Sequence, residues 1–85
     1  MNDEEKRIDD ALFLLGKRVA EQRKKKGMSQ LRLSFEAGVA KSYLSDLERG
    51  LRNPSVKVLV RIAYALNVTL PDLFSNQTGR EKPLI

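Results

Sequence analysis

The side chains that most often carry out nucleophilic or acid–base chemistry are missing from this 85-residue chain, which contains no Cys and no His. Thiolate nucleophiles, imidazole bases and the usual zinc ligands are therefore excluded, and any metal site would depend on carboxylates alone. The sequence also offers no nucleophile–base pair and no phosphate-binding glycine loop. We expect neither an enzyme nor a protein that holds a cofactor or a small-molecule substrate.

The reactive groups that the chain has in excess are cationic. Sixteen Lys and Arg residues against 11 Asp and Glu residues give a net charge of +5. Residues 1–10 contain five acidic and two basic side chains, a net charge of −3, so the remaining 75 residues carry +8. Such an excess attracts polyanions over about 10 Å at ordinary ionic strength, which favours nucleic acid or an anionic membrane as the partner. The densest basic run, residues 23–26, either contacts phosphates or compensates the dipole at a helix end.

Membranes are the less favoured of these two partners. The longest uninterrupted apolar stretch, Ala11 to Leu15, is far below the roughly 20 residues that span a bilayer. The charged N-terminus is followed by no apolar run of signal-peptide length, and without Cys there is no disulfide framework. We therefore expect a cytoplasmic protein that does not bind membranes.

The cationic side chains must be positioned by helices, because apolar residues recur at steps of three and four. In the first third of the chain this spacing predicts a helix from about Asp10 to Lys26, preceded by an acidic extension over residues 1–9. Its apolar stripe consists of Ile8, Leu12, Leu15 and Val19. Asp9 or Asp10 is the expected N-cap, and Gly27 is the expected end.

Two short helices follow, joined by a tight turn at Gly38. Ser29 is a suitable N-cap for the first of them, which has about eight residues. The second runs from Ala40 to Arg49, with Leu44 and Leu47 facing inward, before Gly50 ends it. Two short helices around a glycine turn are the geometry of a helix-turn-helix.

The remaining elements complete an all-α fold. Ser55 caps a fourth helix that ends at Asn67, and Thr69 with Asp72 resembles a capping box at the start of a short fifth helix. No stretch alternates with a period of two, so no sheet is expected. We predict a five-helix domain over residues 10–75 and a flexible tail over residues 76–85.

The order of these signals resembles the helix-turn-helix family of lambdoid phage repressors and Cro proteins, which also includes restriction-modification controllers and many bacterial regulators. The resemblance runs from about Leu15 to Phe74. It is carried by residues 15–19, Arg23 with Gly27, residues 28–30 before Leu33, Gly38-Val39, residues 44–50, Asn53-Pro54-Ser55 and residues 62–68. The resemblance implies a lambda-repressor-like fold with an N-terminally extended first helix. It also implies a sequence-specific DNA-binding regulator of transcription, of the repressor or controller type, whose second motif helix enters the major groove.

The resemblance also implies which residues contact base edges: Lys41, Ser42 and Asp46, with Ala40 and Ser45 beside them. Lys41 can donate to guanine, and Asp46 can accept from the amino group of cytosine. A second interpretation of Asp46 is an ion pair with Arg49, or a contact with Lys41 or Ser42. The two interpretations stay open at this point.

Further residues are assigned to phosphates and to the fold on the same resemblance. The phosphate contacts are Gln30, at the start of the second helix, and the flanking residues Tyr43, Arg49, Arg52 and Asn53. Such contacts make binding salt-dependent without reading sequence. Arg23 and Glu48 are expected to form an ion pair that ties the first helix to the recognition helix.

The sequence departs from the family pattern at two small residues and at one apolar pair. Ala40 replaces the usual Ser or Thr cap, and Ser34 replaces an Ala and can bond back to a carbonyl one turn earlier. Leu31 and Phe35 lie on a face that the family generally keeps polar. We hypothesise that the extension around Ile8, Leu12 and Phe13 covers this pair; the alternative is two exposed side chains.

A second apolar surface is expected on the fourth helix. Val60 and Tyr64, together with Leu70 and Leu73, form a candidate self-complementary patch, and family members commonly dimerise through this end. A two-fold homodimer implies a palindromic operator in double-stranded DNA. The competing reading is a protein-interaction module or antitoxin on the same fold, which would use one of these apolar pairs as its surface.

Overall fold

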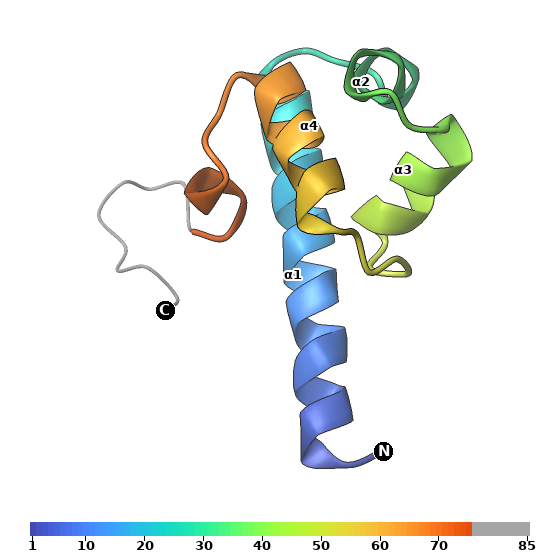
Figure 1. Cartoon of the computed structure of the whole chain (residues 1–85), viewed down its shortest axis with the longest axis vertical. Helices are drawn as coiled ribbons and strands as arrows, with labels where there is room; N and C mark the ends of the chain where they lie inside the picture. The colour runs from blue at the N-terminus through green and yellow to red at the C-terminus, as the bar shows by residue number, and fades with distance from the viewer. Residues whose placement is uncertain (76–85) are drawn as a thin grey trace.

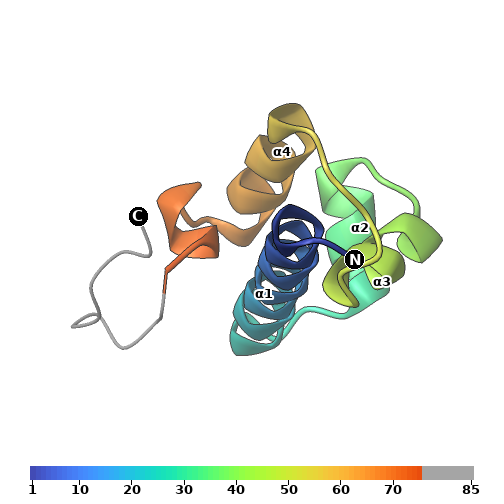
Figure 2. The ribbon, with the colours of Figure 1, turned by 90° about the horizontal axis from the view of Figure 1, so that it is seen from below.

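The computed structural model describes residues 1–75, and these are helical with no strand, as the sequence predicts. Four α-helices follow one another: α1 (Asp3–Lys25), α2 (Gln30–Ala37), α3 (Lys41–Glu48) and α4 (Val56–Leu66). Figure 1 shows α1 as the long axis of the domain, with the other helices beside its C-terminal part. In Figure 2, which looks nearly along α1, α2 and α3 lie on one side of this helix and the C-terminal turn on the other. The predicted tail, residues 76–85, lies outside the described residues.

The expected fifth helix is a single 3-10 turn, η1 (Pro71–Leu73). Its capping box is present, because the Thr69 N–H donates to Asp72 Oδ2 (2.8 Å) and the Asp72 N–H donates to the Thr69 hydroxyl (3.4 Å). The next amides bond three residues back, from Leu73 to Leu70 and from Phe74 to Pro71. Such i to i+3 bonds form a tight turn that rarely propagates. The prediction of five helices is corrected to four helices and one turn within residues 1–75.

Helix α1 begins at Asp3, well before the predicted start at about Asp10. The Asn2 side chain accepts from the Glu5 N–H (2.8 Å), and the Glu5 carboxylate accepts from the Asn2 N–H (3.0 Å). This capping box, with three acidic residues in the first turn, stabilises the positive end of the helix dipole. Asp9 and Asp10 therefore lie within the helix, and the prediction that one of them caps it is wrong.

The apolar stripe of α1 is fully buried only in its C-terminal half. Leu15 and Val19 are buried, Leu12 is half-buried, and Ile8 is 49% exposed. Figure 1 gives the reason, since the first turns of α1 extend past the other helices. The inward position predicted for Ile8 is therefore wrong, although its spacing is helical.

The core lies where α2, α3 and α4 meet the second half of α1, and it is entirely aliphatic. Its members are Leu15, Val19, Leu33, Ala37, Leu44, Leu47, Leu59, Ile62, Ala63, Leu66 and Leu73. Leu73, predicted at a dimer interface, is 0% exposed because η1 turns it into this core. Burying a leucine stabilises a fold by about 1.5–3 kcal/mol, so Leu73 serves the fold and is not offered to a partner.

Leu31 and Phe35 are not covered by the N-terminal extension. They are 63% and 84% exposed, and Phe13 is itself 57% exposed. α2 lies beside the C-terminal end of α1, whereas the extension points to the opposite end of the domain (Figure 1). The predicted cover is wrong because the direction of α1 carries the extension away from α2.

Candidate nucleic-acid interface

The turn between α2 and α3 is built around Gly38, which adopts a left-handed conformation (φ 72°, ψ 32°). Its N–H donates to Phe35 O and the Val39 N–H donates to Ser34 O, so the last carbonyls of α2 are satisfied. Ala40 is the N-cap of α3 and provides no side-chain hydrogen bond, as its residue type predicts. The two helices therefore meet in a tight turn with a weak cap at the start of α3.

Helix α3 buries one face and exposes the other. Leu44 and Leu47 are fully buried in the core. The outer face carries the residues predicted to contact bases: Ala40, Lys41 and Ser42 are exposed, and Ser45 and Asp46 are half-buried. An α-helix fits the major groove, which is about 12 Å wide. α3 thus presents polar side chains on the outside of the domain, where a groove could receive them.

A close backbone approach fixes the C-terminal end of α3 on α1. A Cβ at Gly16 would lie 2.3 Å from the carbonyl oxygen of Leu47, and one at Gly50 (φ +80°) would lie 2.9 Å from the Cα of Phe13. Only glycine leaves room at such contacts. Sequence reasoning assigned no positioning role to Gly16, although a glycine inside a helical pattern is a known signal of close packing.

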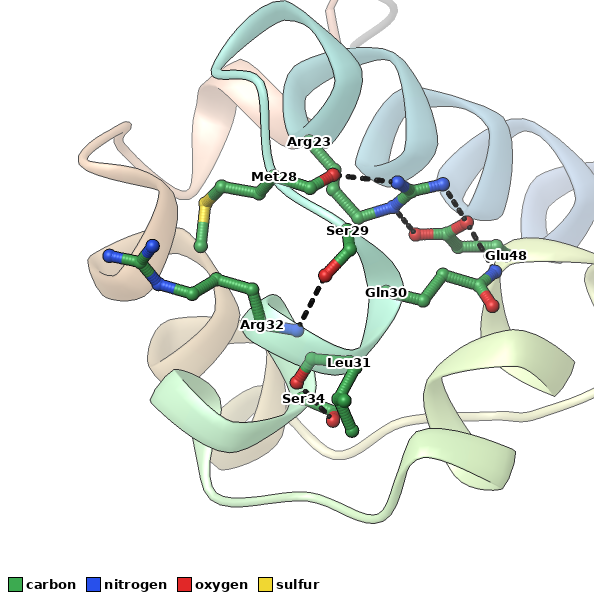
Figure 3. A network of polar contacts seen from close by, with 8 residues as sticks. All are labelled: Arg23, Met28, Ser29, Gln30, Leu31, Arg32, Ser34 and Glu48. Atoms are coloured by element: carbon green, nitrogen blue, oxygen red, sulfur yellow. Dashed lines mark hydrogen bonds and ion pairs between the residues drawn. The ribbon is translucent and has the colours of Figure 1, made fainter.

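A buried ion pair strengthens this connection (Figure 3). Arg23 Nε donates to Glu48 Oε2 (2.7 Å) and Arg23 Nη2 donates to Glu48 Oε1 (3.0 Å), while Nη1 donates to Met28 O (2.8 Å). The two charged side chains are only 10% and 6% exposed. The pair expected from the family resemblance is therefore present, and it links α1, the α1–α2 loop and α3.

Gln30, a predicted phosphate contact, is joined to the same network. Its Nε2 donates to Glu48 Oε1 (3.0 Å), as Figure 3 shows. Because Gln30 is the first residue of α2 and half-buried, this bond fixes its amide beside the end of α3. An amide nitrogen carries two hydrogens, so Gln30 retains a donor for a phosphate.

The serines of α2 act locally. Ser29 is the N-cap and accepts from the Arg32 N–H (3.0 Å), as predicted. Ser34 is buried, and its hydroxyl donates to Leu31 O (2.8 Å), which is the back-bonding expected for it. Both hydroxyls are therefore occupied by the backbone of α2.

A charged cluster lies at the C-terminal end of α3. Asp46 Oδ1 accepts from Arg49 Nη2 (2.5 Å), and Asp46 Oδ2 lies 3.5 Å from Arg52 Nε. The Arg52 guanidinium is 5.1 Å from the centre of the Tyr43 ring, within the range of a cation–π contact. The ion pair with Arg49 is the second interpretation given for Asp46, whereas the contact with Arg52 was not predicted. Asn53, the other predicted phosphate contact, is exposed in the following loop.

Residues 1–75 offer neither a metal site nor a membrane-spanning helix. No group of three or more His, Cys, Asp or Glu side chains there could hold a metal ion. No helix within residues 1–75 has both the length and the apolar character needed to cross a membrane.

Comparison with known proteins agrees with this geometry. The helix-turn-helix family matches residues 19–73, which include α2, the Gly38 turn and α3. The chain belongs to the helix-turn-helix family. The match begins at Val19, so residues 3–18 of α1, which include most of the acidic extension, lie outside the matched region of this helix-turn-helix chain.

Relatives of this helix-turn-helix chain include named regulators. It is 44% identical over 66 residues to the HTH-type transcriptional regulator SlrR of Bacillus subtilis, covering 76% of this chain and 43% of SlrR. It is 41% identical over 69 residues to the HTH-type transcriptional regulator SinR of Bacillus licheniformis, covering 80% of this chain and 62% of SinR. The chain therefore spans less than two thirds of the length of either protein.

Solved structures show the same helix-turn-helix fold. The restriction-modification controller protein C.AhdI from Aeromonas hydrophila superposes with a TM-score of 0.73 at 40% identity, over 74% of this chain and 96% of C.AhdI. The biofilm master regulator SinR, solved in complex with DNA, superposes with a TM-score of 0.68 at 44% identity, over 72% of this chain and 98% of that one. The lambda-repressor-like architecture expected from the sequence is thus shared with proteins of the regulator class.

Proposed function

We propose that this chain is a sequence-specific DNA-binding regulator of transcription, of the repressor or controller type, which acts in the cytoplasm and is not an enzyme. The helix from Ala40 to Arg49 enters the major groove of double-stranded DNA. One observation carries this proposal: α3 is anchored by Leu44 and Leu47 and turns Lys41 and Ser42 outward. The relatives named above are transcriptional regulators and controllers, and SinR has been solved with DNA, which supports the same role here.

Base recognition is assigned to the first half of α3. Lys41 can donate to guanine O6 and N7, and Ser42 can donate or accept, with Ala40 and Ser45 beside them. The exposure of Lys41 and Ser42 supports this role, since a base-reading side chain must reach beyond the helix surface.

Phosphate contacts are assigned to residues on both sides of α3. Gln30 has its amide fixed by Glu48 at the start of α2, where the helix N-terminus also favours an anion. Within α3 the candidate is Tyr43, and beyond its C-terminal end the candidates are Arg49, Arg52 and Asn53. Contacts on both sides would fix the register of α3 in the groove and make affinity depend on salt.

The protein acts as a homodimer in this proposal. Val60 and Tyr64 are 50% and 87% exposed on α4, and Leu70, which follows this helix, is half-buried. Pairing of this surface about a two-fold axis would place the two α3 helices about 34 Å apart, one turn of DNA, and favour a palindromic operator. Sedimentation of the wild type and of Tyr64→Glu at tens of micromolar tests the interface. A monomeric wild type, alone and on operator DNA, would contradict it.

Selection of bound sequences from random duplexes tests DNA recognition. We expect a defined half-site, repeated about one helical turn away. Lys41→Ala is expected to relax one base position by about 1–3 kcal/mol. Lys17→Ala, which removes an exposed lysine from α1, is the matched control and leaves the selected sequence unchanged. An unselective wild type, or an unchanged half-site in Lys41→Ala, would refute the assignment.

A second candidate is a protein-interaction module or antitoxin on the same fold, favoured by the exposure of Leu31 and Phe35. In that case α3 is not the binding surface, and duplex DNA is bound only weakly through charge. Gel shifts at two salt concentrations separate the candidates. A regulator retains a sequence-dependent complex at the higher salt, whereas an interaction module loses all DNA complexes together.

A further inference from the structure

Asp46, which lies near the end of the recognition helix, contacts two arginine side chains. Both carboxylate oxygens face arginines, Oδ1 toward Arg49 (2.5 Å) and Oδ2 toward Arg52 (3.5 Å). Arg52 is also held by the Tyr43 ring, at 5.1 Å from its centre. The Asp46 side chain is 30% exposed, against 64% for Arg49 and 49% for Arg52. The carboxylate therefore lies beneath two more exposed guanidinium groups at the end of the recognition helix.

This arrangement does not favour Asp46 as a base reader. A cytosine amino group would have to displace charged donors from a carboxylate that already has a partner on each oxygen. An arginine adds the attraction between opposite charges to its contact with the carboxylate, which a neutral cytosine amino group cannot supply. A bare carboxylate facing the DNA would also repel the phosphates on either side of the groove. Both considerations favour a role in which Asp46 keeps its arginine partners.

We propose that Asp46 is a positioning residue that restrains Arg49 and Arg52 and so lowers the affinity for DNA of arbitrary sequence. This inference rests on the proposed function: it gives Asp46 a part in how the α3 surface distinguishes its operator from DNA of arbitrary sequence. The three side chains carry a net charge of +1 in place of the +2 of two free arginines. Guanidinium groups held in one geometry contact phosphates only where α3 is seated in the groove. Loosely bound, unseated complexes therefore gain less from them.

The variant Asp46→Asn tests this, because it keeps the size of the side chain and removes its charge. We expect affinity for a scrambled duplex to rise about three- to tenfold, since one repulsive charge is lost and two exposed ion pairs are released. Affinity for the selected duplex rises less, so the ratio between the two duplexes falls. Base preferences keep their order at every position of the half-site.

Glu36→Gln is the matched control. Glu36 forms an ion pair with Arg32 on α2, so this change alters the net charge equally without touching α3. We expect it to change affinity for the scrambled duplex less than twofold. An equal rise in both variants would overturn the proposal, because the effect would then come from net charge alone.

Two other results would also overturn it. In the first, Asp46→Asn relaxes a single base position without any gain on scrambled DNA, which would make Asp46 a base reader. The second is an NMR result obtained without DNA. If the Nε–H resonance of Arg52 is identical in wild type and variant, Asp46 does not restrain Arg52. A shifted and faster-exchanging resonance in the variant supports the restraint.

Failure of the proposed function gives a different result. If the wild-type chain binds neither duplex at low salt, DNA binding is refuted, and with it the effect of Asp46 on DNA affinity. The NMR comparison still decides in that case whether Asp46 restrains the arginines.

Discussion

Replacing Glu48 with alanine is expected to unfold the protein at a clearly lower temperature. The change removes both hydrogen bonds between Glu48 and Arg23 and the bond from Gln30, and it leaves a guanidinium group that is 10% exposed without its carboxylate. Breaking a buried pair from one side costs about 3–5 kcal/mol. Arg23 keeps its bond to Met28 O, so the lower end, about 3 kcal/mol, applies here.

A domain of this size changes its melting temperature by about 4–8 °C per kcal/mol, so Glu48→Ala is expected to lower it by about 12–24 °C. The assay is thermal unfolding followed by circular dichroism at 222 nm. Glu48→Gln keeps the shape of the side chain and one accepting oxygen, but it replaces the other oxygen with a donating amide nitrogen and loses the charge, so an intermediate decrease is expected.

The matched control is Asp10→Asn, which removes a carboxylate from the exposed pair with Lys6, where the side chains are 64% and 68% exposed. Exposed pairs contribute under about 1 kcal/mol, so the control melts within a few degrees of the wild type. A melting temperature for Glu48→Ala no lower than that of the control would refute the reasoning and remove Glu48 from the structural framework.

Three other predictions concern the elements that hold the interface. Gly16→Ala places a Cβ 2.3 Å from the Leu47 carbonyl oxygen, so α1 and α3 must separate. We expect the free energy of unfolding, measured in urea, to fall by about 1–3 kcal/mol. Lys17→Ala, one residue along, is the neutral comparison. Ala40→Ser adds the missing N-cap of α3 and is expected to raise stability by about 1 kcal/mol, or about 4–8 °C in melting temperature; an unchanged melting curve would contradict it. Hydrogen bonds from Thr69, first from its backbone N–H and then from its hydroxyl, hold the pKa of the Asp72 carboxyl below its usual range. Ionised Asp72 therefore stabilises the fold at pH values above the usual pKa of a carboxyl group. This contribution is lost as the pH falls through the lowered pKa. Urea unfolding of wild type and Asp72→Asn is expected to differ near neutral pH and to converge below about pH 4, and a gap that widens in acid would exclude this account.

The elements that were predicted well are those whose signals are local. α2 and α3 are bounded by Ser29, Gly38 and Gly50, and each of these residue types acts on the backbone within one turn. The outward position of Lys41 and Ser42 follows from helical period once Leu44 and Leu47 are placed in the core. Fold class and the exposed face of α3 could therefore be predicted from sequence.

The parts that were predicted wrongly depend on how far packing extends. The stripe that includes Ile8 has the correct period, but a period does not say where neighbouring helices end. The Asn2 and Glu5 capping box was present in the sequence and competed with the more obvious acids at positions 9 and 10. Leu73 could equally face a partner or the core until the path of the chain through η1 was known.

The contacts that were not predicted join residues across a turn. Asp46 meets Arg52 only because the loop after Gly50 folds back along α3, and helical spacing predicts nothing beyond the end of the helix. Gly16 meets Leu47 only because α1 and α3 cross at that point. Such pairings depend on the relative placement of elements, which a single sequence does not contain.

The exposed first turns of α1 have a consequence for amide hydrogen exchange. All side chains from Met1 to Ala11 are exposed, so this part of the helix is supported by local contacts: its own backbone bonds, its capping box and the exposed pair of Lys6 and Asp10. Isolated helices shorter than about 12–15 residues are marginal in water, so these amides open by fraying, independently of the core. We expect amides before Leu12 to exchange at rates that Glu48→Ala leaves unchanged, while those around Val19 exchange faster in the variant. One helix would then report two independent opening reactions, one local and one global.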